Sequence, residues 1–239
     1  LNAAAHIGAR WREGDPVRLQ RPVRTGTASR TLREDEGKSA LAAYGLPVPA
    51  ARTVPVAEAA AAAEAIGFPV VIKAASADLA HKSDVGGVAL NIRSAEEARA
   101  TAARLAALSD TVLVEQMVVD GVAEILVGIT VDPQFGQVLV LGAGGVLTEY
   151  LHDSTSLLPP FTEKAVRAGL DRLNVKRLLA GFRGKPPGDV DALVSAILAV
   201  TAYAGAHVDS LIELDVNPII VRPQGRGVVA VDALVRISE

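Results

Sequence analysis

The sequence contains no cysteine, and this absence removes several kinds of chemistry at once. Disulfide bonds, thiolate nucleophiles and cysteine-based zinc sites are all excluded. Aromatic residues make up only 3% of the 239 residues, so a core must be built from alanine, valine, leucine and isoleucine. Few rings are available to stack on bases, and the net charge of −3 is slightly acidic. We therefore expect no nucleic-acid partner.

Long hydrophobic runs are also missing. The longest one, residues 192–208, is interrupted by Ser195, Thr201 and Tyr203 and is too short for a membrane span. The first residues lack the apolar run of a secretory signal. Because half of the residues are hydrophobic, the composition is typical of a globular protein with one large domain or two small lobes. We expect a cytoplasmic protein with no membrane partner.

The first 35 residues differ from the rest of the chain. Up to Arg33 they contain seven arginines against two acids, Glu13 and Asp15, and glycine and proline interrupt every periodic pattern. This composition predicts a flexible, arginine-rich extension or linker over residues 1–35. A docking arm for an acidic partner is the alternative.

Regular patterns follow and alternate between helix and strand. Ser94 precedes Glu96 and Glu97 as a helix N-cap does. Helices are predicted at residues 36–44, 57–66, 95–108, 162–181 and 189–206, and strands at 69–74, 88–92, 112–114, 125–131, 138–141, 146–150, 210–221 and 228–235. These elements predict an α+β fold in two lobes, residues 36–115 and 116–239, with a hinge near residues 115–121.

Two glycine-containing segments resemble nucleotide-binding motifs but do not match them. Residues 37–39, Gly-Lys-Ser, would end a P-loop only if position 32 were glycine and a strand came before it. Residues 142–145 would need a third glycine at position 147, which is leucine. The sequence therefore predicts neither a P-loop nor a dinucleotide-binding fold.

A group of acid and amide side chains near the C-terminus is the strongest chemical signal. Glu213, Asp215 and Asn217 alternate with apolar residues, so they share one face of a strand. A hairpin centred between residues 224 and 225 would set Asn217 opposite Asp232, and directly paired side chains lie about 5 Å apart at Cβ. Oxygen ligands at this spacing suit Mg²⁺. A solvated strand face that happens to carry acids is the alternative.

A candidate phosphate-binding region lies earlier in the chain. Lys73 ends an apolar strand, where it could contact a phosphate or could simply be an edge charge. The following segment contains His81 and the pair Gly86 and Gly87, whose N–H groups can cradle oxyanions. A histidine there could be a covalent nucleophile or a surface residue.

The strand at residues 112–114 leads into polar residues at the predicted hinge. Backbone groups of Glu115, Gln116 and Met117 could bind an adenine, and a carboxylate could bind ribose hydroxyls. Glu124 lies just beyond.

Taken together, these segments resemble the ATP-grasp domain of the NDP-forming acyl-CoA synthetases, which include ADP-forming acetate–CoA ligase and, more distantly, the β-subunit of succinyl-CoA synthetase. The resemblance covers residues 34–239 and depends on the order of its pieces. These are Tyr44-Gly-Leu-Pro-Val-Pro49, Pro69-Val-Val-Ile-Lys73, His81-Lys-Ser-Asp-Val-Gly-Gly-Val88, Val114-Glu-Gln-Met117, Asp132-Pro-Gln-Phe-Gly136, Gly142-Ala-Gly-Gly-Val146 with Glu149, Glu213-Leu-Asp-Val-Asn-Pro218 and Val231-Asp-Ala233.

The resemblance implies an ATP-grasp fold, in which two α+β lobes hold the nucleotide between them. It also implies that Lys73 contacts the phosphates, that residues 115–117 hold the adenine and that Glu124 lies near the ribose. Asn217 and Asp232 would be the principal Mg²⁺ ligands, with Asp215 close by.

His81 would be a phosphoryl carrier that relays phosphate between ATP or ADP and a phosphohistidine on another domain. Glu149 would lie near this path. Ser83, Gly86 and Gly87 belong to the same loop and would bind the nucleotide.

The family reaction is carboxylic acid + CoA + ATP ⇌ acyl-CoA + ADP + Pi, and phosphoryl transfer is catalysed mainly by positioning and charge stabilisation. The CoA-binding domains of the family have no counterpart in this sequence, so we expect a CoA-binding α-type partner that carries the second phosphohistidine. Many relatives carry an arginine after the aspartate at 153, and this sequence does not. A nucleotide-sensing regulatory module and an ATP-grasp carboxylate–amine ligase are the competing functions.

Overall fold

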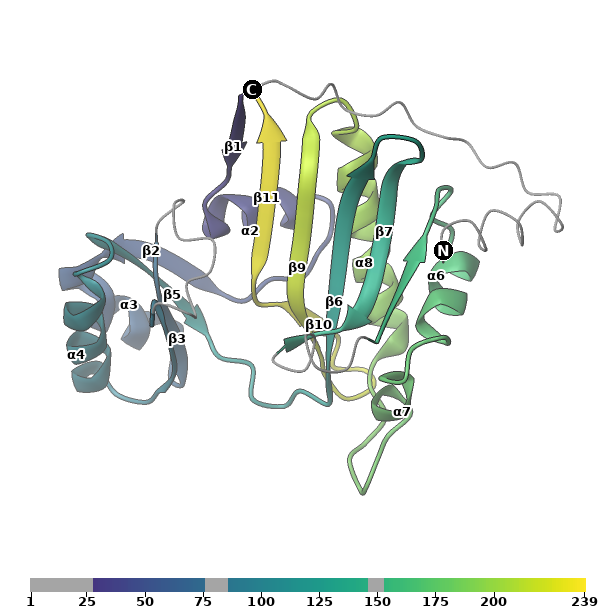
Figure 1. Cartoon of the computed structure of the whole chain (residues 1–239). Helices are drawn as coiled ribbons and strands as arrows, with labels where there is room; N and C mark the ends of the chain where they lie inside the picture. Colours follow the sequence, from purple (N-terminus) through teal and green to yellow (C-terminus); the bar gives the residue numbers. More distant parts are fainter. Residues whose placement is uncertain (1–27, 76–85, 146–152) are drawn as a thin grey trace, which may run out of the picture. The chain divides into compact units, whose positions relative to one another are not determined.

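The computed structural model describes residues 28–75, 86–145 and 153–239 (Figure 1). The chain divides into two compact units. One contains residues 33–36 and 48–119 and is called the four-stranded unit after its sheet. Among the described residues, the other contains residues 28–32, 37–47, 120–145 and 153–239 and is called the seven-stranded unit. The predicted lobe limits of 36–115 and 116–239 stay a prediction. The predicted strand at 146–150 lies outside the described residues.

The four-stranded unit is an antiparallel sheet covered by two helices. Its strand order is β2 (Ala51–Pro55), β5 (Thr111–Gln116), β3 (Val70–Ala74) and β4 (Val88–Ile92). The helices are α3 (Ala59–Ile66), which follows the 3-10 turn η1 (Val56–Glu58), and α4 (Ala95–Leu105). The hydroxyl of Ser94 accepts a hydrogen bond from the N–H of Glu97, which confirms the predicted N-cap.

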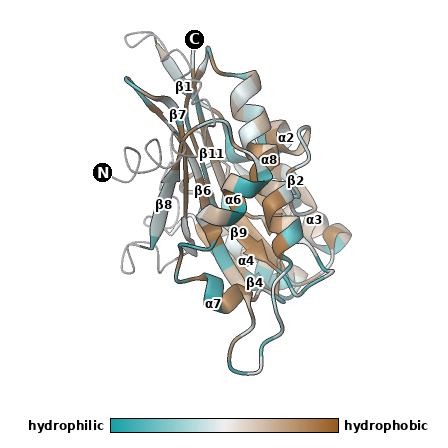
Figure 2. Cartoon of the chain, turned by 90° about the vertical axis from the view of Figure 1, so that its right-hand side faces the viewer, coloured by the Kyte–Doolittle hydropathy of each residue, from teal (hydrophilic) through white to brown (hydrophobic). Residues whose placement is uncertain are grey.

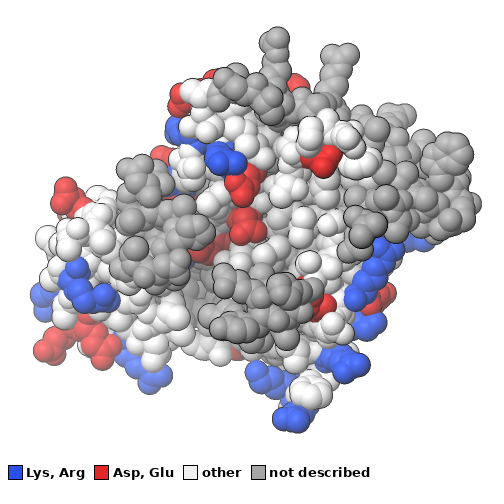
Figure 3. All heavy atoms as spheres, viewed as in Figure 1, with Lys and Arg blue, Asp and Glu red and all other residues white. Residues whose placement is uncertain are grey.

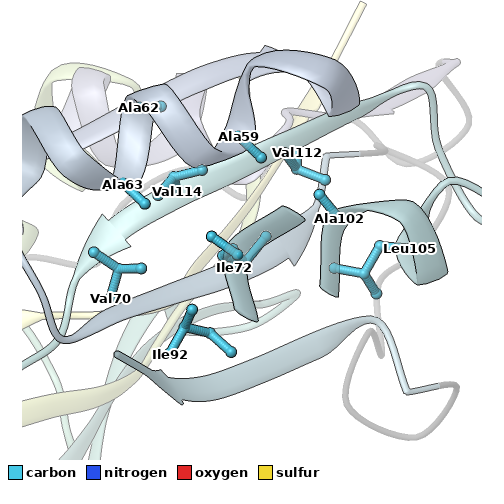
Figure 4. Close-up of a cluster of buried hydrophobic side chains, with 11 residues drawn as sticks. Ala59, Ala62, Ala63, Val70, Ile72, Ile92, Ala102, Leu105, Val112 and Val114 are labelled. Atoms are coloured by element: carbon cyan, nitrogen blue, oxygen red, sulfur yellow. The ribbon is translucent and has the colours of Figure 1, made fainter. Parts of the chain in front are cut away.

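The core of this unit is built from small aliphatic side chains. Alanines on α3 and α4 let the two helices and the sheet approach closely, and valine, leucine and isoleucine fill the remaining space. Its buried members, most of them labelled in Figure 4, are Ala59, Ala62, Ala63, Val70, Ile72, Ile92, Ala98, Ala102, Leu105, Val112 and Val114. The prediction of a core without aromatic rings is confirmed for this unit.

The seven-stranded unit contains the longer sheet. In order, the strands are β1 (Ser29–Thr31), β11 (Ala233–Ser238), β9 (Leu211–Val221), β6 (Ala123–Asp132), β7 (Gly136–Ala143) and β8 (Ser154–Leu157), and β10 (Val228–Ala230) also pairs with β9. All of these pairings are antiparallel. Both units combine a sheet with helices, so the predicted α+β class is confirmed.

Helices of the seven-stranded unit pack on one side of its sheet. Figure 2 shows α6 (Glu163–Leu170) and α8 (Val190–Ala206) there, and α8 contacts β6 and β9. The short helix α7 (Lys176–Leu179) precedes α8, and the last two turns of α2 (Glu34–Ala42) belong to this unit. None of the helices in the described ranges has the length and hydropathy of a membrane span.

Several predicted elements are corrected by the structure. The helix predicted over 162–181 is two helices, because residues 171–175 turn away between α6 and α7. Strands β2 and β8 were not predicted. Residues 29–31 form β1 and α2 begins at Glu34, so the prediction of a flexible segment is wrong for residues 29–35, whereas residues 1–27 lie outside the described residues. These edge strands are only three to five residues long, so they are too short to show a clear apolar alternation.

Candidate functional site

The C-terminal hairpin brings the predicted metal ligands to the same place. Val228, Val229 and Ala230 pair with Val221, Ile220 and Ile219, and Ala233 pairs with Val216. The register on both sides therefore sets Asp232 opposite Asn217, as predicted. Between these two paired stretches, the N–H of Val231 donates a hydrogen bond to the carbonyl of Pro218 at 3.1 Å, which keeps the same register.

Asn217 and Pro218 lie in a bulge of β9. On the neighbouring strand β6, Ile125 pairs with Ile219 but Val127 pairs with Val216, so two residues of β9 stand opposite one residue of β6. A bulge of this kind redirects side chains and is frequent beside functional sites. The apolar residues Leu214 and Val216 are buried, whereas Asp215 and Asn217 are only half-buried.

Negative charge accumulates along this strand. Burial raises the pKa of Asp215 to about 6, and repulsion from Asp232 and Glu213 adds to the shift. Glu213 is partly compensated, because its carboxylate lies 3.1 Å from the guanidinium of Arg236. On the face shown in Figure 3, carboxylates gather over β9 and β11. A cation placed here would relieve a repulsion that is already present.

The donor set fits Mg²⁺ in kind. No cluster of three histidine, cysteine, aspartate or glutamate side chains within metal-binding reach occurs in the described part of the chain. Mg²⁺ does not need one, because it commonly takes one or two carboxylates and completes its shell with water and substrate phosphates. Asp232 and the amide oxygen of Asn217 are the residues that would hold the ion, and Asp215, whose pKa is raised first by burial, lies beside them.

Lys38, from the rejected P-loop-like segment, also reaches this hairpin. It is 3% exposed, and its ammonium donates to the carbonyl of Val231 at 3.3 Å, one residue before Asp232. Sequence reasoning gave this lysine no role. The amphipathic pattern of α2 could have indicated that position 38 faces the protein.

Lys73, in the four-stranded unit, is held between two acids. Its ammonium lies 2.5 Å from Glu34 and 3.0 Å from Glu115, and all three side chains are buried. The reading of Lys73 as an edge charge is therefore wrong, because a lysine is buried only when it is paired. Glu34 was missed, since it was assigned to the flexible extension. The run of acids that begins α2 was the available signal.

Two of the predicted adenine-binding residues already use their backbone N–H groups in hydrogen bonds within the protein. The N–H of Gln116 donates to the carbonyl of Ala50, and the N–H of Met117 donates to the carbonyl of Pro69. Glu115 is 2% exposed and paired with Lys73. Any contact of Gln116 or Met117 with an adenine would therefore use carbonyl oxygens or side chains rather than these N–H groups.

The pair Gly86 and Gly87 lies directly before β4, which begins at Val88. Gly86 has a positive φ of 70°, and its carbonyl accepts a hydrogen bond from Arg104 at the end of α4. Gly87 is buried, and its carbonyl accepts from the N–H of Ala74, the residue after Lys73. Gly87, which follows the predicted histidine loop, therefore lies beside β3. His81, Ser83 and Glu149 lie outside the described residues.

Asp153, where the sequence was expected to depart from the family pattern, has a local role. Its carboxylate accepts hydrogen bonds from the N–H groups of Asn174 and Val175 and from the side chain of Asn174. These bonds fix the turn between α6 and α7.

Comparisons with known proteins agree with this fold and site. A family model described as "ATP-grasp domain" matches residues 25–237. The β subunit of acetate–CoA ligase [ADP-forming] II from Pyrococcus furiosus is 40% identical over 212 residues, which cover 84% of this chain and 89% of that subunit. The chain spans about a third of the length of other curated relatives.

Solved structures of acetyl-coenzyme A synthetase 1 from Ca. Korarchaeum cryptofilum are also similar. One, in complex with coenzyme A and Ca-AMPCP, has a TM-score of 0.81 and 33% identity, and the match covers 88% of this chain and 94% of that one. Another, with coenzyme A and Mg-AMPPCP and its phosphohistidine segment pointing towards the nucleotide binding site, has a TM-score of 0.76 and 31% identity and covers 98% and 99%. The chain belongs to the ATP-grasp domain family and is a homologue of the β subunits of ADP-forming acetate–CoA ligases.

Proposed function

We propose that this chain is the nucleotide-binding, phosphoryl-transferring part of an ADP-forming acyl-CoA synthetase. The proposed reaction is carboxylic acid + CoA + ATP ⇌ acyl-CoA + ADP + Pi. The observation that carries the proposal is the hairpin that sets Asn217 opposite Asp232 beside the acid Asp215. The homology to ligase β subunits supports the same activity.

Each candidate residue has a defined task in this proposal. The ammonium of Lys73, oriented by Glu34 and Glu115, donates to a phosphate oxygen. Glu124 binds the ribose, and residues 115–117 lie along the adenine. Asn217 and Asp232 provide oxygen ligands, with Asp215 beside them. A bound Mg²⁺ would neutralise phosphate charge and orient the phosphates.

His81 is the proposed carrier of the phosphoryl group. A ring nitrogen attacks the γ-phosphorus of ATP, the bond to the β-phosphate oxygen breaks, and ADP leaves. The phosphoryl group then passes to a histidine of a CoA-binding α-type partner. Ser83, Gly86 and Gly87 form the loop around it, and Glu149 lies near its path. The phosphohistidine segment of the Korarchaeum relative, which points towards the nucleotide site, supports such a transfer.

Calorimetry with Mg–ADP tests the nucleotide site. Asp232→Asn should weaken Mg–ADP binding at least about tenfold, because even indirect supports of a metal ligand have effects of that size. Asp209→Asn is the matched control, since Asp209 is an exposed acid just before β9. Equal affinities for both variants would show that the hairpin is not the metal site.

Labelling with γ-³²P-ATP, Mg²⁺ and a CoA-binding α-type partner tests the relay. We expect acid-labile phosphate on the wild-type chain and on His207→Ala, but none on His81→Ala. Nucleotide binding without any label transfer would instead support a regulatory sensor. Full activity of His81→Ala would support a carboxylate–amine ligase.

A further inference from the structure

Gly145, in the glycine-rich segment after β7, contacts a proposed metal ligand directly. Its N–H donates a hydrogen bond to Oδ1 of Asn217 at 2.9 Å. A backbone N–H can only donate, so this bond determines which end of the Asn217 amide is the oxygen. An amide oxygen has two lone pairs, so Oδ1 keeps one for a cation. The bond therefore orients Asn217 for metal binding without occupying it completely.

The same glycine leaves space for the carboxylate of Glu124. A Cβ atom added at position 145 would lie 1.7 Å from Oε2 of Glu124 and 3.0 Å from its Cδ. No side chain can be placed there unless Glu124 moves. Gly145 also has a positive φ of 70°, which other residues adopt at a cost of roughly 1–2 kcal/mol. The positive φ favours glycine whatever its neighbours do, whereas the clash with Glu124 could be relieved only by turning that exposed side chain away from its present position.

The neighbouring Gly144 allows this segment to lie close against the backbone of β6. Its N–H donates to the carbonyl of Glu124 at 2.9 Å. A Cβ at position 144 would lie 2.8 Å from the carbonyl carbon of Ile125, which is backbone and cannot move aside. Gly144 therefore holds the backbone of β6 at Glu124, while Gly145 holds the side chain of Asn217 on β9.

We propose that Gly145 is a positioning residue that aligns two parts of the nucleotide site, the carboxylate of Glu124 and the amide of Asn217. The inference rests on the proposed function, because it assigns Glu124 to the ribose and Asn217 to Mg²⁺. The site of an added Cβ at position 145 lies 1.7 Å from Oε2 of Glu124, and the nitrogen of Gly145 lies 2.9 Å from Oδ1 of Asn217, so the two oxygens lie within about 8 Å of each other. Gly145 thus lies against both side chains: it donates a hydrogen bond to Asn217 and leaves the space that the Glu124 carboxylate occupies.

A pair of variants separates this role from ordinary strain. Gly145→Ala combines the strained φ with the clash against Glu124. Gly184→Ala is the matched control, because Gly184 has a φ of 83° and no atom within 4 Å of an added Cβ. Glu124→Ala removes the carboxylate that the methyl group would meet, so the double variant Glu124→Ala/Gly145→Ala has room for both alanines.

Calorimetry with ADP, with and without Mg²⁺, gives the first result. Gly145→Ala should bind Mg–ADP more weakly than Glu124→Ala does, because it disturbs Asn217 as well as Glu124. The double variant should bind as tightly as Glu124→Ala alone, and at least about fivefold more tightly than Gly145→Ala. Mg²⁺ should increase the affinity for ADP less in Gly145→Ala than in the wild type. In the double variant, the increase caused by Mg²⁺ should recover. Gly184→Ala should bind as the wild type does.

Thermal unfolding without nucleotide gives the second result and does not depend on the proposed function. Gly145→Ala should lower Tm more than Gly184→Ala, and Glu124→Ala should restore part of that loss. If Gly145→Ala fails to fold, the same rescue is measured as recovery of folded double variant.

Additive losses in the double variant, in affinity and in Tm, would overturn the inference, since the clash would then not be the cause. Absence of Mg–ADP binding by the wild-type chain would refute the proposed function and the metal role of Gly145 together. The Tm series would still decide whether Gly145 positions Glu124. The two failures are therefore distinguishable.

Discussion

The half-buried carboxylate of Asp215 predicts a change in stability whose size depends on pH. Its pKa is raised from 3.8 to about 6, first by burial and then by the neighbouring acids Asp232 and Glu213. A raised pKa means that the folded chain binds the proton more tightly than the unfolded chain. Stability is therefore fully present below pH 3.8 and is lost as pH rises through about 6.

The magnitude follows from the shift. About two pKa units correspond to about 3 kcal/mol of destabilisation by the ionised carboxylate at neutral pH. Asp215→Asn keeps the shape of the side chain and removes the charge. We therefore expect Asp215→Asn to be more stable than the wild-type chain by up to about 3 kcal/mol at pH 8, and equally stable at pH 3.5.

Urea unfolding followed by circular dichroism, between pH 3.5 and 8 and without divalent cations, measures this difference. Asp209→Asn is the control, because its exposed side chain should give no comparable gain. A difference between Asp215→Asn and the wild type that does not change with pH would refute the reasoning. So would a variant that is less stable at pH 8, since it would mean that the charge is already compensated.

Three further changes test the contacts that support the two units. Lys73→Met should destabilise the chain by about 3–5 kcal/mol in urea unfolding, because Glu34 and Glu115 would lose the buried cation that both of them contact. Asp189→Ala should cost about 1–2 kcal/mol, since Asp189 caps α8 and also accepts the N–H groups of Gly225 and Gly227. Ser94→Ala should cost about 1 kcal/mol through loss of the α4 cap, and Ser94→Asp should retain most of that stability. A smaller loss for Lys73→Met than for Ser94→Ala would contradict the assigned burial.

The hairpin could be predicted from the sequence because two signals determine it together. The alternation around Leu214 and Val216 identifies the buried face, and the glycine-containing turn at residues 223–227 fixes the register. A slip of one residue would expose the apolar side chains, so few alternatives exist. Helix α8 was also predicted, although its apolar residues are spread around the helix rather than confined to one face.

The surroundings of Lys73 could not be predicted in this way. Glu34 is 39 residues away in the sequence, and its contact with Lys73 depends on how α2 enters the four-stranded unit. Strand β2 was missed because Pro55 and the prolines before it suggest a loop, yet an edge strand tolerates proline. The role of Gly145 depends on the position of Glu124 on a different strand, which no local pattern reports.

The charges within each unit indicate that the nucleotide needs a divalent cation in order to bind. In the four-stranded unit, Lys73 faces two carboxylates, so it can donate a hydrogen bond to a phosphate but brings no net positive charge. In the seven-stranded unit, the acids around Asp215 repel one another and would repel a phosphate as well. Neither Lys73 with its two acids nor the carboxylate of Asp215 offers a net positive charge to a polyphosphate. A divalent cation changes this balance, because it satisfies the acids and presents positive charge to the phosphates. Binding of ADP should therefore depend strongly on Mg²⁺, and Asp215→Asn should weaken that dependence while it stabilises the unliganded chain.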